Sequence, residues 1–298
     1  MLGCDCNAGL SNTGRPGCVP IWSVTSSLIV VPLYANDGTR NGIDLSTSVP
    51  VWADLVNESD ASKRWFPLPA FENVELPKAE SQFEEAPSGR MAFLRQGKRS
   101  FTGELWQEDS TPTFLGKLDK SRCVDFGVYV VDVNGNLIGS KEGDYLYPIP
   151  VDNASWNPTF MFATDSTVQK IMLTFDFDRL FNDSTMYMIT VDEAGQDFTA
   201  LSGLIDLNLN NAAATTTEVT FDAQLDYGTA YNPILFTGAL AADFVVTVAG
   251  VIDAGITLSE GPDGSYTLTF SSPASSSDEV KVEVDKVGFD GEVTVVVP

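Results

Sequence analysis

Histidine, the side chain best suited to proton transfer near neutral pH, does not occur in this chain of 298 residues. Its absence excludes Ser-His-Asp and Cys-His catalysis, and it excludes zinc sites that contain histidine. Enzymes that depend on carboxylates alone or on Mg²⁺ remain compatible with the composition. Any chemistry that this sequence supports therefore rests on its carboxylates and its cysteines.

Two groups of acidic residues have spacings that suggest a site. The segment 132–136 (Asp-Val-Asn-Gly-Asn) offers oxygen ligands at alternate positions, as a calcium loop does, but its twelfth position is Gly143 instead of glutamate. Asn-Gly between two apolar runs indicates a tight β-hairpin, which is the interpretation we favour. Asp176, Asp178 and Asp183, with Asp192 and Glu193, could supply paired carboxylates for catalysis. Asp176 and Asp178 alternate with apolar residues, however, which predicts the solvated face of a strand.

Three of the four cysteines, Cys4, Cys6 and Cys18, lie near the N-terminus, and Cys123 stands alone. Their proximity suggests a metal or disulfide knot, but Cys-x-Cys is not the spacing of a zinc knuckle and no fourth ligand is near. Reduced, partly buried cysteines in a protein made inside a cell are the simpler interpretation. We predict no catalytic residue, no metal and no cofactor, and a protein that is not an enzyme.

Most of the elements that must position these residues have the pattern of a β-strand. Runs rich in β-branched and aromatic residues recur at 22–33, 90–93, 100–106, 125–132, 156–162, 169–178, 186–191 and 204–207. A helix is predicted at 49–57, with Ser48 as its N-cap and Pro50 in its first turn, and a weaker helical pattern covers 114–121. We expect a β-sandwich or barrel with one flanking helix.

The composition changes near residue 210. The segment 208–217, rich in Asn, Ala and Thr, is typical of a linker, and only Lys281 and Lys286 are basic beyond it. Seven short strand patterns follow, at 218–221, 234–237, 244–248, 255–258, 266–270, 280–284 and 292–297. The sequence predicts two domains, a β domain over residues 1–210 and an immunoglobulin-like sandwich over 214–298.

The segment 63–103 is long, rich in proline and poor in regular pattern. Such a segment is either a surface loop or an arm that becomes ordered on a neighbouring molecule, and the sequence leaves both open. We take 78–99 as a candidate contact arm between subunits. Its candidate contact residues are Lys78, Glu80, Phe83, Glu84, Arg90, Arg95, Lys98 and Arg99. We expect the basic cluster formed by Arg95, Lys98 and Arg99 to pair with acidic residues of an adjacent subunit.

The overall charge is strongly negative. Forty-one acidic and 17 basic residues give a net charge of −24, which repels nucleic acid and anionic lipid. The most apolar stretch, residues 27–33, is far shorter than the roughly 20 residues of a membrane-spanning helix. We predict no membrane insertion and no specific binding of DNA.

Seven segments together form a pattern that goes beyond local structure. They are 52–56 (WADLV), 67–69 (PLP), 72–74 (ENV), 78–81 (KAES), 97–103 (GKRSFTG), 115–118 (LGKL) and 127–139 (GVYVVDVNGNLIG). Through them, about residues 20–210 resemble structural proteins of long-tailed bacteriophages and prophages of Bacteroidetes-like hosts. The resemblance is strongest to their major tail tube proteins.

The resemblance implies stacked hexameric rings of β domains flanked by a helix, with a long loop or hairpin that reaches adjacent rings. Residues 52–56 would form the flanking helix, and residues 78–99 would form the contact arm. The implied partners are further copies of the chain, other tail proteins, and DNA that passes through an acidic lumen without binding. The C-terminal module would be displayed outside, where host-surface glycans are candidate ligands. The protein would be made in the host cytoplasm and end in the virion tail.

Other functions remain open at this stage. An adhesive or virion-surface glycan-binding protein would use the C-terminal sandwich as its binding module. A carboxylate glycosidase would need two carboxylates about 5–10 Å apart in a cleft lined with aromatic residues. Another capsid or tail component would have the same sequence features as a tube protein.

Overall fold

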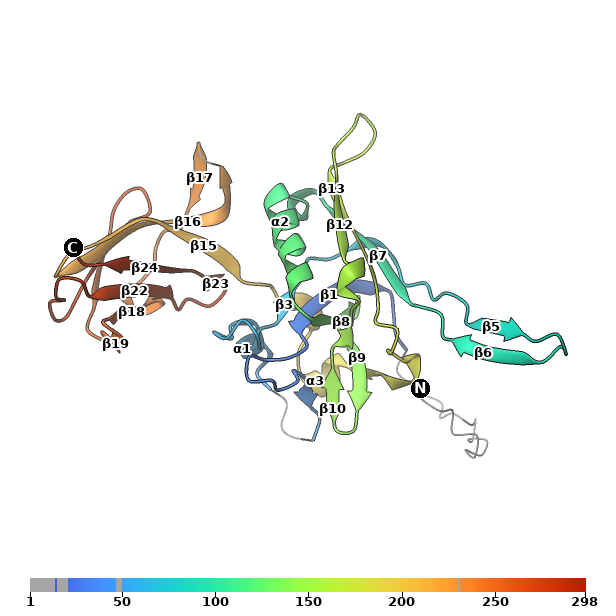
Figure 1. Cartoon of the computed structure of the whole chain (residues 1–298). Helices are drawn as coiled ribbons and strands as arrows, with labels where there is room; N and C mark the ends of the chain where they lie inside the picture. Colours follow the sequence, from blue (N-terminus) through green and yellow to red (C-terminus); the bar gives the residue numbers. More distant parts are fainter. Residues whose placement is uncertain (1–13, 15–20, 47–49, 230) are drawn as a thin grey trace.

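The computed structural model describes residues 14, 21–46, 50–229 and 231–298, so Cys4, Cys6, Cys18 and Ser48 lie outside the described residues. Strands make up 46% of the structure and helices 13%. The mainly-β fold predicted from the alternating runs is therefore confirmed. Two β structures lie next to each other along the chain, a larger N-terminal body and a C-terminal sandwich (Figure 1).

The N-terminal body is built on an eight-stranded sheet with the order β2-β10-β9-β8-β1-β3, in which β11 also pairs with β8 and β14 with β9. Its strands are β1 (Thr25–Pro32), β2 (Ile43–Asp44), β3 (Phe66–Pro67), β8 (Phe126–Asp132), β9 (Leu137–Glu142), β10 (Tyr145–Tyr147), β11 (Ile149–Pro150) and β14 (Met186–Ile189). Every residue of β8 is buried. This is the reason for its unbroken apolar sequence, since side chains cover both faces of the sheet.

A second sheet of four strands, in the order β12-β13-β7-β4, covers one face of the first. Its strands are β4 (Glu72–Glu75), β7 (Ser100–Trp106), β12 (Asn157–Met161) and β13 (Lys170–Asp176). Phe101, Leu105 and Leu173 are fully buried between the sheets. On the other face of the large sheet, Trp52 and Trp65 pack around the buried Tyr129. The alternation predicted for residues 169–178 thus separates core residues from solvated ones.

Three α-helices occur in the described part of the chain: α1 (Trp52–Val56), α2 (Pro112–Lys120) and α3 (Val191–Ala194). Short 3-10 segments are η1 (Gln107–Asp109), η2 (Ser121–Cys123), η3 (Asn153–Ser155), η4 (Asp183–Thr185), η5 (Phe198–Ala200) and η6 (Ala241–Asp243). The helix predicted at 49–57 is a single turn that begins at Trp52, so Pro50 precedes it. It starts there because the Trp52 indole is buried and donates a hydrogen bond to the Ala194 carbonyl at 3.0 Å.

Helix α2 is longer than α1, which reverses the order expected from the sequence. The Thr111 hydroxyl accepts a hydrogen bond from the Phe114 amide, and Pro112 occupies the first turn, where a proline costs no hydrogen bond. Leu118 is buried in the core between the two sheets. The weaker helical pattern predicted at 114–121 begins after Thr111 and Pro112 and therefore leaves out these start signals.

The Asn-Gly segment forms the hairpin between β8 and β9, as predicted. The Asp132 carboxylate is buried and accepts hydrogen bonds from the amides of Ser23, Asn134 and Asn136, at 2.9 to 3.2 Å, and from the Asn136 side chain. Gly135 has a φ of 80°, a conformation that glycine adopts without strain. The carboxylate therefore organises the turn, in agreement with the hairpin interpretation.

The C-terminal sandwich consists of two sheets, β20-β21-β16-β15-β23, with β17 paired to β16, and β19-β18-β22-β24. The strands are β15 (Ile205–Ala214), β16 (Glu218–Thr229), β17 (Asn232–Leu235), β18 (Phe244–Val248), β19 (Val251–Ile252), β20 (Thr257–Glu260), β21 (Ser265–Thr269), β22 (Glu279–Val284), β23 (Phe289–Asp290) and β24 (Glu292–Val296). The seven strands predicted here are all present. A separate core, with Phe221, Val246 and Leu268 at its centre, lies between the sheets.

The linker predicted at 208–217 is wrong. Strand β15 runs through it and pairs with β16, so the chain enters the sandwich at Ile205 and the boundary expected between 210 and 214 lies too late. Leu207 and Leu209 are buried and alternate with exposed residues, which is the pattern of a half-buried strand. The asparagines and threonines around them concealed it.

Polar contacts join the sandwich to the N-terminal body. Lys117 of α2 forms ion pairs with Asp206 at 2.9 Å and with Asp226 at 3.2 Å. On another side of the junction, the buried Arg64 pairs with Asp290 at 2.6 Å. These contacts come from both β15–β16 and β23, so they hold the sandwich from two sides.

Candidate interaction surface

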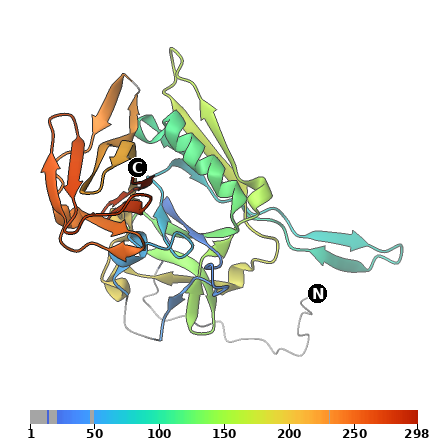
Figure 2. The same ribbon diagram turned by 60° about the vertical axis from the view of Figure 1, so that its left-hand side comes forward.

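The candidate arm contains a β-hairpin formed by β5 (Gln82–Glu85) and β6 (Met91–Arg95). Pro87 suits the second position of its turn, and Gly89 has a φ of 80°. The Ala86 amide donates to the Arg90 carbonyl at 2.8 Å and closes the turn. The hairpin projects from the N-terminal body into solvent (Figures 1 and 2). This part of the segment is therefore a formed hairpin in the single chain, without a neighbouring molecule.

The hairpin carries apolar side chains that nothing in its own chain covers. Every residue from 82 to 96 is exposed. Phe83, Met91, Phe93 and Leu94 have exposed fractions of 55%, 57%, 53% and 55%. Phe83 and Phe93 are register partners whose rings meet edge to face at 5.7 Å, and Met91 lies two residues along on the same side. We call Phe83, Met91 and Phe93 the apolar face of the hairpin.

The root of the hairpin is a short, closely packed ribbon. The Ala79 amide donates to the Lys98 carbonyl at 2.8 Å, and the Ser100 amide donates to the Pro77 carbonyl at 2.9 Å. Gly97 is packed so closely against Ala79 that an added Cβ would collide with the Ala79 carbonyl. The two chains therefore approach each other at a point where only glycine fits.

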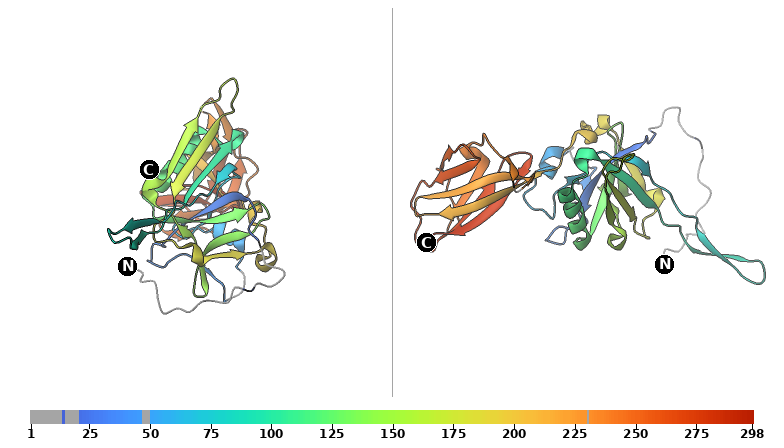
Figure 3. Two further views of the ribbon diagram at one scale, coloured as in Figure 1. Left: turned by 90° about the vertical axis from the view of Figure 1, so that its right-hand side faces the viewer. Right: turned by 90° about the horizontal axis from the view of Figure 1, so that it is seen from above.

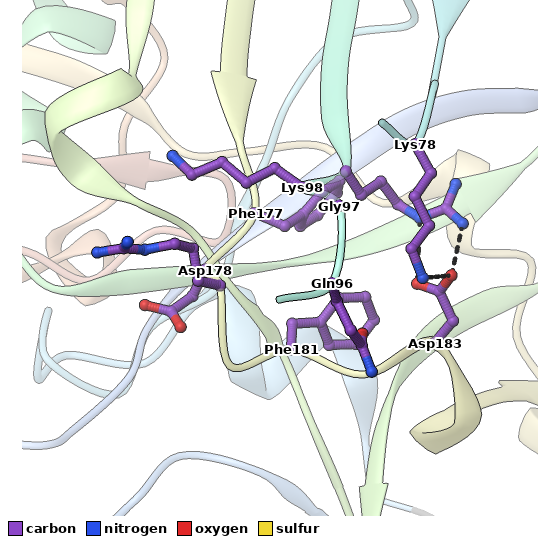
Figure 4. Close-up of a pocket in the computed structure, with 10 residues that line it drawn as sticks. Lys78, Gln96, Gly97, Lys98, Phe177, Asp178, Phe181 and Asp183 are labelled. Atoms are coloured by element: carbon purple, nitrogen blue, oxygen red, sulfur yellow. Dashed lines mark hydrogen bonds and ion pairs between the residues drawn. The ribbon is translucent and has the colours of Figure 1, made fainter. Parts of the chain in front are cut away.

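Three basic residues of the predicted set fix this root to the body. Lys78 and Arg99 both bind the Asp183 carboxylate, at 2.8 and 2.9 Å (Figure 4). Lys98 bridges Asp152 and Asp176 at 3.2 and 3.1 Å. The recess between these groups has a volume of about 10 Å³, which is no more than a water molecule needs and far less than a cofactor needs.

These ion pairs shift the pKa values of their members. The hydrogen bond from Arg99, followed by that from Lys78, lowers the pKa of Asp183 below its ordinary value, against the effect of burial. Hydrogen bonds to Asp176 and then to Asp152 raise the pKa of Lys98. Both shifts favour the charged forms, so the root stays ionised over the whole neutral range.

The structure corrects the partners predicted for the basic cluster. Lys98 and Arg99 pair with acidic residues of their own chain instead of a neighbour's, because the end of β13 and the η4 turn bring Asp176 and Asp183 to the root. The Arg95 guanidinium donates to Gln82 across the hairpin at 2.8 Å. The side chains of Glu80, Glu84 and Arg90 make no hydrogen bond or ion pair with any other described residue.

Sequence reasoning missed Met91, Phe93 and Leu94 as surface residues. Met91 and Phe93 fall in the strand run predicted at 90–93, but an apolar run in a short segment looks the same in a core and on an arm. The signal that could have found them is Pro-Ser-Gly between Phe83 and Phe93, because a tight turn places two such residues opposite each other. Phe83 itself is on the predicted list of contact residues and lies on the apolar face.

The remaining candidates for chemistry have structural roles. Asp176 binds Lys98 and accepts a hydrogen bond from the Ser100 hydroxyl, and Asp178 caps a turn by accepting from the Leu180 amide. Cys123 is a free, exposed thiol. Within the described ranges, no group of three or more Cys, Asp or Glu side chains is arranged to hold a metal ion. The described helices include none that is long and apolar enough to cross a membrane.

Comparison with known proteins adds no relative. A scan against protein-family models and a search of curated proteins both return no match for this chain.

Proposed function

We propose that this chain is a self-assembling structural protein that forms the stacked, hexameric rings of a tail tube in a long-tailed bacteriophage or prophage. The single observation that carries the proposal is the hairpin, whose apolar face is more than half exposed while it projects from a well-packed body. Exposed apolar groups gathered on one feature usually mark a surface where another protein binds.

The physical state of the hairpin supports the same conclusion. A two-stranded hairpin alone is marginally stable in water, and this one gains nothing from burial within its own chain. Its root is nevertheless fixed by five ion-pair contacts that involve Lys78, Lys98 and Arg99. A rigid base that presents an uncovered end is the arrangement that a contact arm between subunits requires.

The charge and the position of the sandwich fit the proposal too. With a net charge of −24, the wall of a ring would repel the phosphates of DNA, so that DNA passes without binding. The C-terminal sandwich and the hairpin lie at opposite ends of the molecule (Figure 3). In an assembly held by the hairpin, residues 205–298 would then be displayed away from that contact, on the outside of a virion tail.

Electron microscopy of the purified full-length protein in negative stain, with light scattering for mass, tests the proposal. We expect rings or tubes with a central channel and outer knobs formed by the C-terminal sandwich. A protein that stays a monomer at millimolar concentration would overturn the proposal.

A hairpin-replacement variant links assembly to the hairpin. In it, residues 82–95 are exchanged for a short Gly-Ser turn, which leaves Lys78, Lys98 and Arg99 in place. We expect a folded monomer with the melting temperature of the natural chain, since no buried side chain is removed. Rings formed by this variant as readily as by the natural chain would show that the hairpin is not the contact arm.

A further inference from the structure

A second exposed apolar feature lies at the loop that joins β12 to β13. Every residue from 161 to 168 is exposed, and Phe162 has an exposed fraction of 81%. Met161 and Val168 add apolar surface on the two sides of the loop. The loop is nevertheless well formed, because the Thr164 amide donates to the Thr167 carbonyl at 2.9 Å. We call Met161, Phe162 and Val168 the tip patch.

The tip patch and the hairpin lie at opposite ends of the same strands. In the register of the sheet, Lys170 pairs with Trp106 at the end of β7 next to the loop, and Asp176 pairs with Ser100 at the end next to the hairpin root. Figure 1 shows the loop and the hairpin leaving the body in different directions. The two features therefore cannot meet within one copy, but they can meet between two copies.

The turn of the hairpin and the tip of the loop carry opposite charges. The stretch 86–103 contains four basic residues and no acidic one, although the chain has 41 acidic residues. Arg90, at the turn of the hairpin, and Asp165, at the end of the β12–β13 loop, both have side chains without a hydrogen-bond or ion-pair partner among the described residues. The turn of the hairpin and the tip of the loop thus each combine uncovered apolar side chains with an unpartnered charge, and these two charges are opposite in sign, while Glu84 and Glu85 of β5 are further unpartnered charges on the hairpin.

We infer that the apolar face of the hairpin in one copy packs on the tip patch of a second copy, with Arg90 beside Asp165. This inference rests on the proposed self-assembly and specifies the surface that receives the arm. The contact joins two different surfaces, so the copy that gives its arm keeps a free tip patch and the copy that receives it keeps a free arm. Copies therefore add in one direction, and the contact continues until a ring closes or a stack ends.

A second copy fits this surface better than an unrelated partner. Each copy carries one donor surface and one acceptor surface, so assembly covers all of them in equal number. The opposite charges of Arg90 and Asp165 also favour this approach.

A charge exchange in the full-length protein tests the contact. The variants are Arg90→Asp, Asp165→Arg and their combination, and the measured quantity is the critical concentration for assembly by light scattering. We expect each single change to raise it at least about fivefold, because it places like charges opposite each other at every contact. The combination should return it to about the natural value.

The control is Asp263→Arg, which makes the same change of charge on the exposed β20–β21 turn of the C-terminal sandwich. Alone it should leave the critical concentration unchanged, and together with Arg90→Asp it should fail to rescue assembly. A combination with Asp165→Arg that assembles no better than the one with Asp263→Arg overturns the contact, and so do single variants that assemble normally. If the natural chain itself does not assemble, the proposed function and this contact both fall.

Discussion

The hairpin and the C-terminal sandwich both extend from the same body, but they are built in opposite ways. The sandwich has a core of its own, in which Val219, Val246 and Leu268 are completely buried. No residue of β5 or β6 is buried. The sandwich thus has a core made by its own side chains, whereas the hairpin buries none of its residues and leaves its apolar face uncovered within its own chain.

This difference separates two uses of the same β-structure. Burial of apolar area is the main source of stability, so residues of the sandwich core are needed for folding. The apolar residues of the hairpin bury no surface within one chain, so we do not expect the chain to need them for folding. We therefore expect the sandwich core to determine stability and the hairpin to determine association, and substitutions in each region test this expectation.

Truncating one phenylalanine in each region is the strongest test. Phe221 is buried in the sandwich, where it packs against Phe244 and Tyr266, so Phe221→Ala should lower the free energy of unfolding of the sandwich by about 3–5 kcal/mol. Phe93→Ala should change it by less than about 0.5 kcal/mol, because the ring is already more than half exposed. Urea unfolding followed by far-ultraviolet circular dichroism, at concentrations below assembly, measures both.

Assembly should respond in the reverse order. Phe93→Ala removes a central ring of the apolar face and should raise the critical concentration, while any folded fraction of Phe221→Ala should assemble through an intact hairpin. A Phe93→Ala protein that unfolds as easily as Phe221→Ala would show that the hairpin belongs to the folding unit, and the comparison would fail.

The fold was predictable where apolar residues follow a simple period. Residues 126–132 read as a buried strand, and the alternation at 169–178 identified a strand with one face in the core. Strand β15 was not predictable in this way, because asparagine and alanine outweigh its two buried leucines. Helix α2 was underestimated for a related reason, since its stability depends on a cap and on packing against β12, which a local pattern does not contain.

The candidate surface was predictable as a segment but not in its detail. Mixed charges and prolines marked residues 78–99, yet the sequence could not show that Asp183, more than 80 residues away, would bind Lys78 and Arg99. Pairing of distant charges depends on the topology of the sheets. Whether Phe93 is buried or exposed also depends on which strand it pairs with, and β6 pairs with β5 instead of joining the body.

A glycine at the root of the hairpin, Gly97, and a glycine in α2, Gly116, allow a test of whether the root sets the direction of the arm. Gly97→Ala would place a methyl group against the Ala79 carbonyl, so the ribbon must shift and its local stability should fall by about 1–3 kcal/mol. We expect the arm to change direction and assembly to be lost, while the thermal transition of the sandwich stays in place. Light scattering and differential scanning calorimetry on the same samples measure both effects.

Gly116→Ala is the matched control. This glycine lies inside α2 with open space where its Cβ would be, so alanine should stabilise the body by up to about 1 kcal/mol and leave assembly unchanged. Assembly that survives Gly97→Ala would mean that the direction of the arm is unimportant, and that the root does not pre-organise the contact.

The smallest expected effect is the dependence of the root on pH. The lowered pKa of Asp183 means that its contribution to stability is present above the unfolded value of about 3.9 and is lost as the pH falls through the folded value. The raised pKa of Lys98 means that its contribution is present below about 10.4 and is lost as the pH rises through the folded value. The root should therefore be firmest between about pH 4 and pH 10.

Hydrogen exchange at the Ala79 and Ser100 amides reports this directly, since both close the root ribbon. Their protection, corrected for the intrinsic exchange rate, should fall by less than about tenfold between pH 6 and pH 3, because Asp183 is partly exposed and its ion pairs are weakened by solvent. Added salt should reduce the difference. The Leu268 amide in the sandwich, which has no ion pair of its own, should keep its protection. Equal losses of protection at the Ala79 and Leu268 amides would show that acid destabilises the whole chain. The ion pairs would then not stabilise the root separately from the rest of the chain.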